Sequence, residues 1–112
     1  MQSVKQSFYM TDLASMLISM AYDVLQTKRF GRQNKKLNAH VVLDVDSAVV
    51  EVAETPNIGE RKKGDLASLY VYKFSSQIQL YIHGYTLDHV LRLVYLQAVS
   101  SHENFYKDLK RS

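Results

Sequence analysis

Three strand-like runs in quick succession constrain the fold more than any other feature of this chain. Residues 69–74 and 77–85 alternate along their length, as strands with one buried face do, and residues 90–99 are mostly apolar, as a central strand is. The segments between the runs are short enough to join antiparallel neighbours. The pattern predicts a mainly antiparallel sheet of three to four strands in the second half of the chain.

A valine-rich segment at residues 39–54 supports two interpretations. Its β-branched side chains favour a strand, whereas its length favours a helix. Four valines recur at helical spacings of three and four, with acidic residues mostly on the other face. We interpret the segment as a helix that ends before Pro56, because the residue before a proline is pushed out of the helical region. The apolar stripe of this helix is predicted to contain Val42, Val45, Val49 and Val52.

The remaining segments complete an α+β fold. Residues 23–26 suit a short strand, and residues 30–37 suit a basic helix. A last helix is predicted to open at Ser100, which has capping-box spacing to Glu103. The chain should therefore place two N-terminal helices on one face of the sheet and end in a short C-terminal helix.

The composition narrows the classes of function. The 112 residues fit one domain, and the absence of cysteine excludes disulfide scaffolds, thiolate zinc sites and cysteine nucleophiles. No apolar run reaches the roughly 18 residues that cross a membrane. No glycine-rich phosphate loop occurs, and no two histidines have the helical spacing of a zinc site. We expect no metal or other cofactor, and a cytoplasmic location without a membrane partner.

Most basic residues lie in three clusters, although the net charge is only +3. Acidic residues fall largely between the clusters, so the charges are segregated along the chain. One interpretation is three solvated faces, and the other is a basic surface for nucleic acid or for an acidic segment of a partner. The clusters are Lys28, Arg29, Arg32, Lys35 and Lys36, then Arg61, Lys62 and Lys63, then Lys107, Lys110 and Arg111.

The C-terminal segment, residues 100–111, brings together an imidazole, a phenol and three cations. Cleavage of RNA by attack of a 2′-hydroxyl needs a proton acceptor, a proton donor and cations for the developing phosphorane charge. His102 can act as acid or base near neutral pH, and Phe105 and Tyr106 can stack on an unpaired base. The simpler interpretation makes His102 a surface residue and Phe105 a core residue.

Two blocks of sequence are specific when they occur together: PNIGERKKGDLA at residues 56–67 and SHENFYKDLKR at residues 101–111. Shorter runs at residues 30–37, 46–49 and 71–74 accompany them. Through these blocks the chain resembles toxins of the RelE/ParE superfamily, the toxic halves of bacterial type II toxin–antitoxin modules. The resemblance implies a strand and a helical hairpin followed by a three-stranded antiparallel sheet, with the valine-rich segment as the second helix.

The superfamily holds two unlike activities, ribosome-dependent mRNA cleavage and inhibition of DNA gyrase. In its ribonucleases a basic strand residue and a C-terminal histidine or tyrosine serve catalysis. The resemblance therefore implies that His102 is the acid–base, Tyr106 a stacking or proton-relay group, and Lys73 the basic strand residue. The phosphate contacts implied in the same way are Arg61, Lys62, Lys63, Lys110 and Arg111.

One position departs from the ribonuclease pattern. Many ribonuclease members carry an arginine three residues before a tyrosine of the third strand, where this chain has Ile78 before Tyr81. Loss of a guanidinium removes a bidentate phosphate contact. His83 and Arg92 are the candidates for supplying the missing charge.

The resemblance also implies partners and a domain boundary. We expect a cognate antitoxin, together with mRNA on the ribosome, or with DNA gyrase if the chain is a non-enzymatic gyrase inhibitor. A third possibility is an inactive toxin that binds the antitoxin and helps it repress their shared promoter. Residues 1–19 are expected to be an extension, helical or foreign to the native start, with residues 20–112 as the toxin domain.

Overall fold

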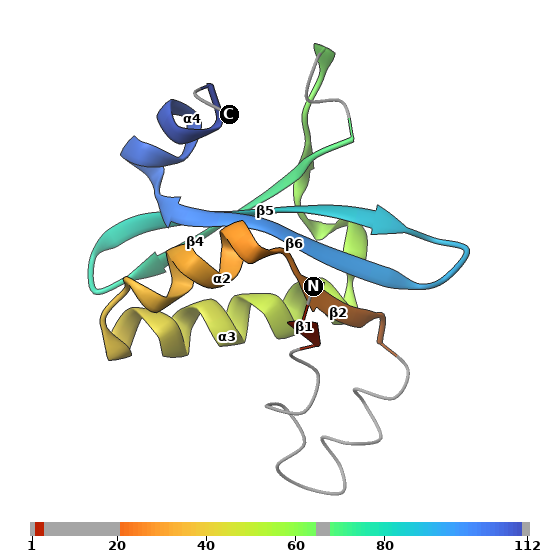
Figure 1. Ribbon diagram of the computed structural model, residues 1–112, viewed down its shortest axis with the longest axis horizontal. Helices are drawn as coiled ribbons and strands as arrows, with labels where there is room; N and C mark the ends of the chain where they lie inside the picture. Colours follow the sequence, from red (N-terminus) through yellow and green to blue (C-terminus); the bar gives the residue numbers. More distant parts are fainter. Residues whose placement is uncertain (1, 4–20, 65–67, 111–112) are drawn as a thin grey trace, which may run out of the picture.

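The computed structural model describes residues 2–3, 21–64 and 68–110, and these form one mixed sheet with helices on both faces (Figure 1). Within these residues the sheet has six strands in the order β1-β2-β6-β5-β4-β3. β2 runs parallel to β6, and every other neighbouring pair is antiparallel. The strands are β1 (Gln2–Ser3), β2 (Asp23–Gln26), β3 (Glu60–Arg61), β4 (Tyr70–Ser76), β5 (Gln79–Asp88) and β6 (Leu93–Ser101). The helices are α2 (Lys28–Lys35), α3 (Ala39–Glu54), the 3-10 helix η2 (Pro56–Ile58) and α4 (His102–Lys110).

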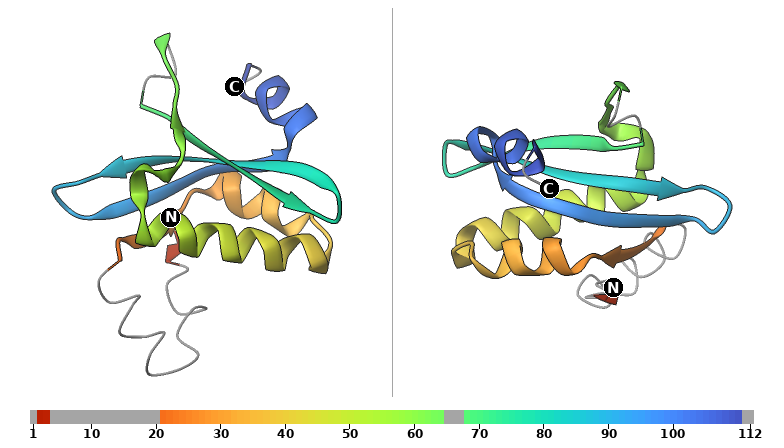
Figure 2. Two further views of the ribbon diagram at one scale, coloured as in Figure 1. Left: turned by 180° about the vertical axis from the view of Figure 1, so that it is seen from behind. Right: turned by 45° about the horizontal axis from the view of Figure 1, so that its top comes forward.

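The helices form two unequal layers. Among the described helices, α2 and α3 cover one face of the sheet and α4 lies on the other, as the two views of Figure 2 show. The α+β class and the helical hairpin are confirmed. The predicted sheet of three to four strands was too small, because β1 and β3 have two residues each and are too short for any sequence pattern. The sheet is mainly antiparallel as predicted, and the parallel pairing of β2 with β6 was not predicted. The helical layer predicted for one face is confirmed for α2 and α3, and the position of α4 on the opposite face was not predicted.

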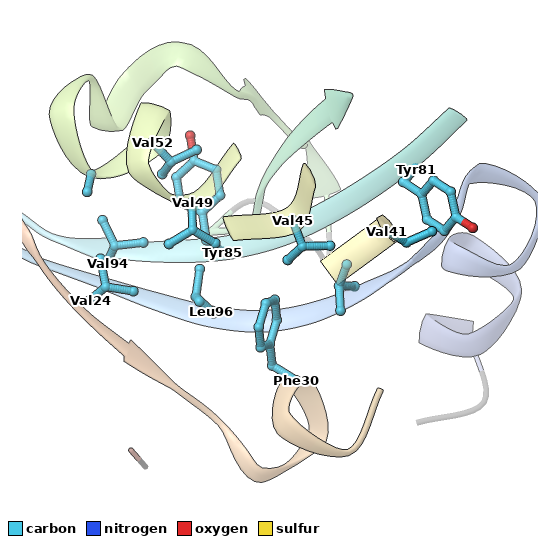
Figure 3. Packing of buried hydrophobic residues seen from close by; sticks show 12 residues of the cluster. Val24, Phe30, Val41, Val45, Val49, Val52, Tyr81, Tyr85, Val94 and Leu96 are labelled. Carbon is cyan, nitrogen blue, oxygen red and sulfur yellow. The ribbon is translucent and has the colours of Figure 1, made fainter. Parts of the chain in front are cut away.

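Helix α3 confirms the helical interpretation of the valine-rich segment. It begins where the Asn38 side chain accepts a hydrogen bond of 3.1 Å from the Val41 amide, and it ends just before Pro56. Val41 is buried where the prediction had Val42, which is only half-buried. In Figure 3 the buried valines of α3 converge with Phe30 of α2 and Tyr85 of β5.

Helix α2 is tied to the edge of β6 by side chains. Thr27 caps the helix by accepting from the Phe30 amide at 3.2 Å, and its hydroxyl donates to the Leu96 carbonyl at 3.0 Å. This cap lets the helix begin at Lys28, before the predicted start. Beyond the end of β2, the Gln33 side chain accepts from the Val99 amide at 2.9 Å, so a helix side chain replaces a strand partner.

The ends of β6 differ from the prediction at both sides. Val90 and Leu91 lie in the β5–β6 turn, where they are 91% and 63% exposed, so the apolar run at residues 90–99 is only partly strand. At the other end the strand continues through Ser100 to Ser101. Ser100 is therefore not a helix cap, and α4 begins at His102.

Tyr85 anchors the connection between α3 and the sheet edge. Its side chain is buried, and its hydroxyl donates to the Pro56 carbonyl at 2.7 Å and accepts from the Gly59 amide at 3.0 Å. A Cβ atom at Gly59 would lie 2.6 Å from this hydroxyl oxygen and 2.9 Å from the Val71 carbonyl oxygen. Only glycine therefore fits at this position. Burial raises the pKa of the Tyr85 phenol to about 12, so it remains a donor at physiological pH.

None of the helices in the described part of the chain is long and apolar enough to span a membrane.

His83 is a fully buried histidine beneath α3. Its ring is surrounded by Tyr72, Phe74 and Tyr85, with ring centroids 5.5 to 6.2 Å away. Among the described residues, neither ring nitrogen has a hydrogen bond of good geometry. Burial lowers the pKa of His83 from 6.5 to about 4, and the Ala48 backbone on α3 offsets this lowering only in part.

We predict that His83 makes the fold sensitive to acid. The unfolded chain takes up a proton at this residue below pH 6.5, and the folded chain does so only near pH 4. The free energy of unfolding should therefore fall by about 3 kcal/mol as the pH drops through this interval. Urea denaturation at pH 7 and pH 4.5 measures it. His83→Leu should flatten the difference, whereas His40→Ala, at an exposed histidine, should not. An unchanged pH dependence in His83→Leu would contradict the assignment.

Candidate functional site

The face of the sheet that carries α4 holds the residues singled out for chemistry. Lys73 on β4, Ile82 on β5 and Ser100 on β6 are directly opposite one another. Residues opposite one another in antiparallel strands point to the same face. Ile82 packs with Phe105 of α4, so Lys73 and Ser100 also lie on the α4 face. We call this surface the α4 face.

Helix α4 is held on this face by one aromatic side chain. Phe105 is buried among Leu69, Val71, Ile82 and Ala98. Its ring lies directly over Gly84, where an added Cβ would be 2.8 Å from the ring carbon Cζ. The interpretation of Phe105 as a core residue is confirmed, so its ring is not available to stack on a base.

His102 is the first residue of α4 and is exposed. It follows β6 without a connecting loop, because the strand ends at Ser101. The strand that leads to it is separated from the strand of Lys73 by two inter-strand spacings, about 10 Å, and His102 lies two residues, about 7 Å, beyond Ser100, which is in register with Lys73. A lysine side chain and an imidazole can span that interval to reach one bound phosphodiester. The structure therefore places His102 and Lys73 on the same side of the sheet.

The basic loop before β4 is divided between the two faces. Glu60 is opposite Val71, which puts it on the α4 face, and Lys62 returns to that face with its Nζ atom 3.5 Å from the Glu60 carboxylate. Arg61 is opposite Tyr70, whose side chain packs in the core of the other face. Of this cluster, Lys62 shares the α4 face with Lys73, and Arg61 does not. Lys63 is exposed.

The other predicted site residues are only partly described. Tyr106 and Lys110 lie in α4, but their side chains are outside the described part of the structure, as is the whole of Arg111. In Figure 1 the C-terminal end of α4 and the β3–β4 arm both rise from the α4 face. The predicted phosphate contacts at Lys62 and Lys110 thus belong to elements on the same side of the sheet.

Neither candidate for the missing arginine charge reaches the α4 face. His83 points into the opposite core, and Arg92 lies in the β5–β6 turn with its guanidinium 4.8 Å from the centre of the Tyr22 ring. Ile78 itself lies at the tip of the β4–β5 hairpin, where it is fully exposed. Its φ of 64° is unusual for a β-branched residue. The departure from the ribonuclease pattern therefore stands.

A polar hollow beside His102 escaped the sequence interpretation. It has a volume of about 450 Å³ and brings together side chains of α2, β5, β6 and α4. No carboxylate or imidazole lines it among the described residues, so its chemistry is that of amides, hydroxyls and one ammonium group. No local pattern could have revealed it, because it unites segments far apart in the chain. Its polar lining includes Gln33, Lys36, Gln79, Tyr81, Ser101 and Asn104.

The geometry suits side-chain chemistry. Across residues 2–3, 21–64 and 68–110, no three histidine, aspartate or glutamate side chains gather as a metal site. The α4 face instead offers an exposed imidazole, two lysines and a polar hollow at its edge. Such a set can transfer protons and bind negatively charged oxygen atoms.

The sequence was compared with models of known protein families. The model of ParE-like toxins of type II bacterial toxin–antitoxin systems matches residues 24–110. The chain belongs to the ParE-like toxin family. This confirms the resemblance drawn from the blocks at residues 56–67 and 101–111. A search of curated proteins found no match for this toxin.

Solved structures agree on the fold of this toxin. It is similar to a chain of the toxin–antitoxin complex RelBE2 of Mycobacterium tuberculosis, with 20% identity, a TM-score of 0.66, and coverage of 73% of this chain and 99% of that one. A chain of the intact Escherichia coli RelBE complex gives 25% identity, a TM-score of 0.61, and coverage of 71% of this chain and 95% of that one. A mutant of Escherichia coli RelE in the free state gives 25% identity, a TM-score of 0.63, and coverage of 82% of this chain and 98% of that one.

We predict that Gly84 is required for α4 to dock. Gly84→Ala would push against the Phe105 ring and should destabilise the toxin by about 1 to 3 kcal/mol, as overpacking does. Urea denaturation measures the loss, and hydrogen exchange should show faster exchange of the α4 amides.

The matched control is Gly31→Ala within α2. A Cβ there lies at an ordinary 3.4 Å from the Gln26 side chain, and replacing glycine inside a helix should stabilise by up to about 1 kcal/mol. Equal stability of the two variants, with unchanged exchange in α4, would show that Gly84 has no such role.

Proposed function

We propose that this toxin is a ribosome-dependent mRNA endonuclease that inhibits translation and growth. The observation that carries the proposal is the placement of His102. Phe105 packs over Gly84, this packing fixes α4 on the sheet, and the first residue of α4 is then held on the same face as Lys73. An acid–base group and a cation facing one surface are what cleavage of a phosphodiester requires.

The proposed chemistry assigns a role to each group. His102 accepts the proton of the attacking 2′-hydroxyl or donates a proton to the departing 5′-oxygen. Lys73 stabilises the negative charge that develops on the phosphorane oxygens. Tyr106 serves as a stacking or proton-relay group. The flanking phosphates are bound by Lys62, Lys63, Lys110 and Arg111, whereas Arg61, which is opposite Tyr70, faces the other side of the sheet.

The polar hollow supports the same proposal. It adjoins His102 through Ser101 and Asn104, and its amide and hydroxyl groups can form hydrogen bonds with the edge of an unpaired base. Lys36 adds a positive charge at its rim. A nucleotide next to the scissile bond would thus be oriented beside the acid–base group.

We also propose a cognate antitoxin as partner. The RelBE structures that this toxin resembles are complexes of a toxin with its antitoxin. An antitoxin segment that is partly acidic and partly apolar would complement the lysines of the α4 face. It would fold on binding and restrict access of RNA to His102.

We predict that His102→Ala lowers the rate of mRNA cleavage on purified ribosomes by at least 100-fold, the usual contribution of general acid–base catalysis. Growth inhibition in cells should be lost with it. The control is His40→Ala, because His40 is also exposed but lies on α3, on the other face of the sheet. Undiminished cleavage by His102→Ala would refute the catalytic role.

A second prediction separates charge from shape at Lys73. Lys73→Gln keeps much of the side-chain length and removes the charge, so it should lower the cleavage rate roughly tenfold or more while leaving stability unchanged, because Lys73 is exposed. Lys73→Arg restores a cation and should recover much of the rate. Equal rates for the two variants would show that the charge at Lys73 is not used.

Gyrase inhibition is the second candidate function, and Ile78 is the observation that favours it. With Ile78 at a hairpin tip, no arginine of β5 contributes to the α4 face. Toxin expression would then accumulate DNA cleavage complexes while mRNA stays intact, and His102→Ala would remain toxic. A chain that is not toxic at all would be an inactive toxin that acts through its antitoxin.

A further inference from the structure

A second basic surface lies on α2, away from the α4 face. Residues 28–36 hold five cations and no acidic residue. Only Phe30 of this helix is buried, so the rest of α2 is polar and at least partly exposed. We call the surface formed by Lys28, Arg29, Arg32 and Lys35 the α2 surface; Lys36, which follows the helix, lines the polar hollow beside His102 instead.

Within the described part of the chain, no acidic side chain neutralises the cations of residues 28–36. Within residues 2–3, 21–64 and 68–110, none of the five forms an ion pair, whereas Lys62 on the other face is paired with Glu60. Carrying four like charges on so short a helix, with a fifth at its C-cap, is unfavourable without a counter-charge. The arrangement therefore favours an anionic partner.

A hollow adjoins this surface. It has a volume of about 620 Å³, and its described lining includes three of the cations, Lys28, Arg32 and Lys35, but no carboxylate. Asn34 also lines it, and its side-chain oxygen is buried without a hydrogen-bond partner among the described residues. An unsatisfied buried acceptor beside three cations indicates a ligand that brings a hydrogen-bond donor, such as a ribose 2′-hydroxyl, as well as negative charge.

The spacing of the three cations suits a nucleic-acid backbone. With a helical rise of 1.5 Å per residue, Lys28, Arg32 and Lys35 lie about 6 and 4.5 Å apart along the helix axis. Each strand of a DNA duplex presents one phosphate per about 3.4 Å of its axis, so on a nucleic-acid backbone of comparable charge spacing these three cations cover about three phosphates of one strand.

The composition of the surface disfavours a protein partner. Protein interfaces depend on a few anchors, most often Trp, Tyr and Arg, packed in a largely apolar centre, and the exposed part of α2 offers arginines but no aromatic or aliphatic side chain. The large exposed apolar side chains lie elsewhere, on α3, in η2 and β5, and at the two hairpin tips. Recognition of a uniform polyanion through its backbone needs no such anchors.

We propose that the α2 surface binds the phosphate backbone of duplex RNA and so anchors the toxin beside its substrate. The choice of RNA rests on the proposed function. Because α2 and α4 lie on opposite faces of the sheet, a duplex bound at α2 leaves His102 and Lys73 open to a separate single strand (Figure 2).

The test measures binding of a 20-base-pair RNA duplex of arbitrary sequence to the purified full-length toxin, by fluorescence anisotropy over a series of salt concentrations. The triple variant Lys28→Ala, Arg32→Ala, Lys35→Ala should bind at least tenfold more weakly at low salt. The slope of log affinity against log salt should decrease in magnitude by about 2 to 3, close to one for each phosphate that the variant no longer neutralises.

A matched control removes the same net charge elsewhere. Ser47→Asp, Asn57→Asp and Ser68→Asp, all at exposed positions off α2, should leave the salt slope nearly unchanged. The variant Lys28→Arg, Lys35→Arg should retain binding. Equal weakening by the acidic control, or wild-type binding by the triple alanine variant, would overturn the proposal. The proposal would also be overturned if the triple alanine variant lost only its binding to acidic peptides, because the partner would then be a protein.

The outcome is separable from that of the cleavage proposal. His102→Ala should bind the duplex normally, because His102 lies on the opposite face. If His102→Ala stays toxic while the α2 variant loses duplex binding, the cleavage assignment fails and the RNA anchor stands. If His102→Ala is inactive while the α2 variant binds duplex like the wild type, the reverse holds.

Discussion

The two faces of β5 hold the whole molecule together. Ile82 and Gly84 point to one side, where Phe105 packs over them and fixes α4. His83 and Tyr85 point to the other side and lie beneath α3. Because successive side chains of a strand alternate in direction, the short segment of residues 82–85 packs against both helical layers. A one-residue shift of register in β5 would exchange these two sets and remove the contacts of both layers with the sheet.

This arrangement also distributes charge and chemistry. Through Tyr85, the core face positions η2 and therefore the arm that carries Lys62. Through Phe105, the α4 face positions His102. The cations of α2 remain on the far side, since Thr27 and Gln33 hold that helix along the β6 edge. The net charge of +3 thus resolves into two separated basic surfaces, one at the proposed reaction site and one suited to a nucleic-acid backbone.

Local patterns predicted which helices and strands form better than they predicted the residues at which these elements begin and end. The α3 helix follows from the valine spacing, the Asn38 cap and Pro56, all of which are close in sequence. The ends of β6 could not be predicted, because Val90 and Leu91 are as apolar as a buried strand although a turn exposes them. The same limit applies to the site. His102 and Lys73 were singled out by residue type and resemblance, whereas the division of Arg61 and Lys62 between two faces depends on pairing with β4.

The amino-acid sequence by itself determined the α+β class, the helical hairpin, the succession of the main strands along the chain and the membership of the toxin family. Each of these depends on local periodicity or on residues that can be compared directly. Only the tertiary structure decided that α4 lies opposite α2 and α3, that β2 pairs in parallel with β6, and that a polar hollow adjoins His102. These features join residues far apart in the chain, and long-range packing rather than local preference sets their positions.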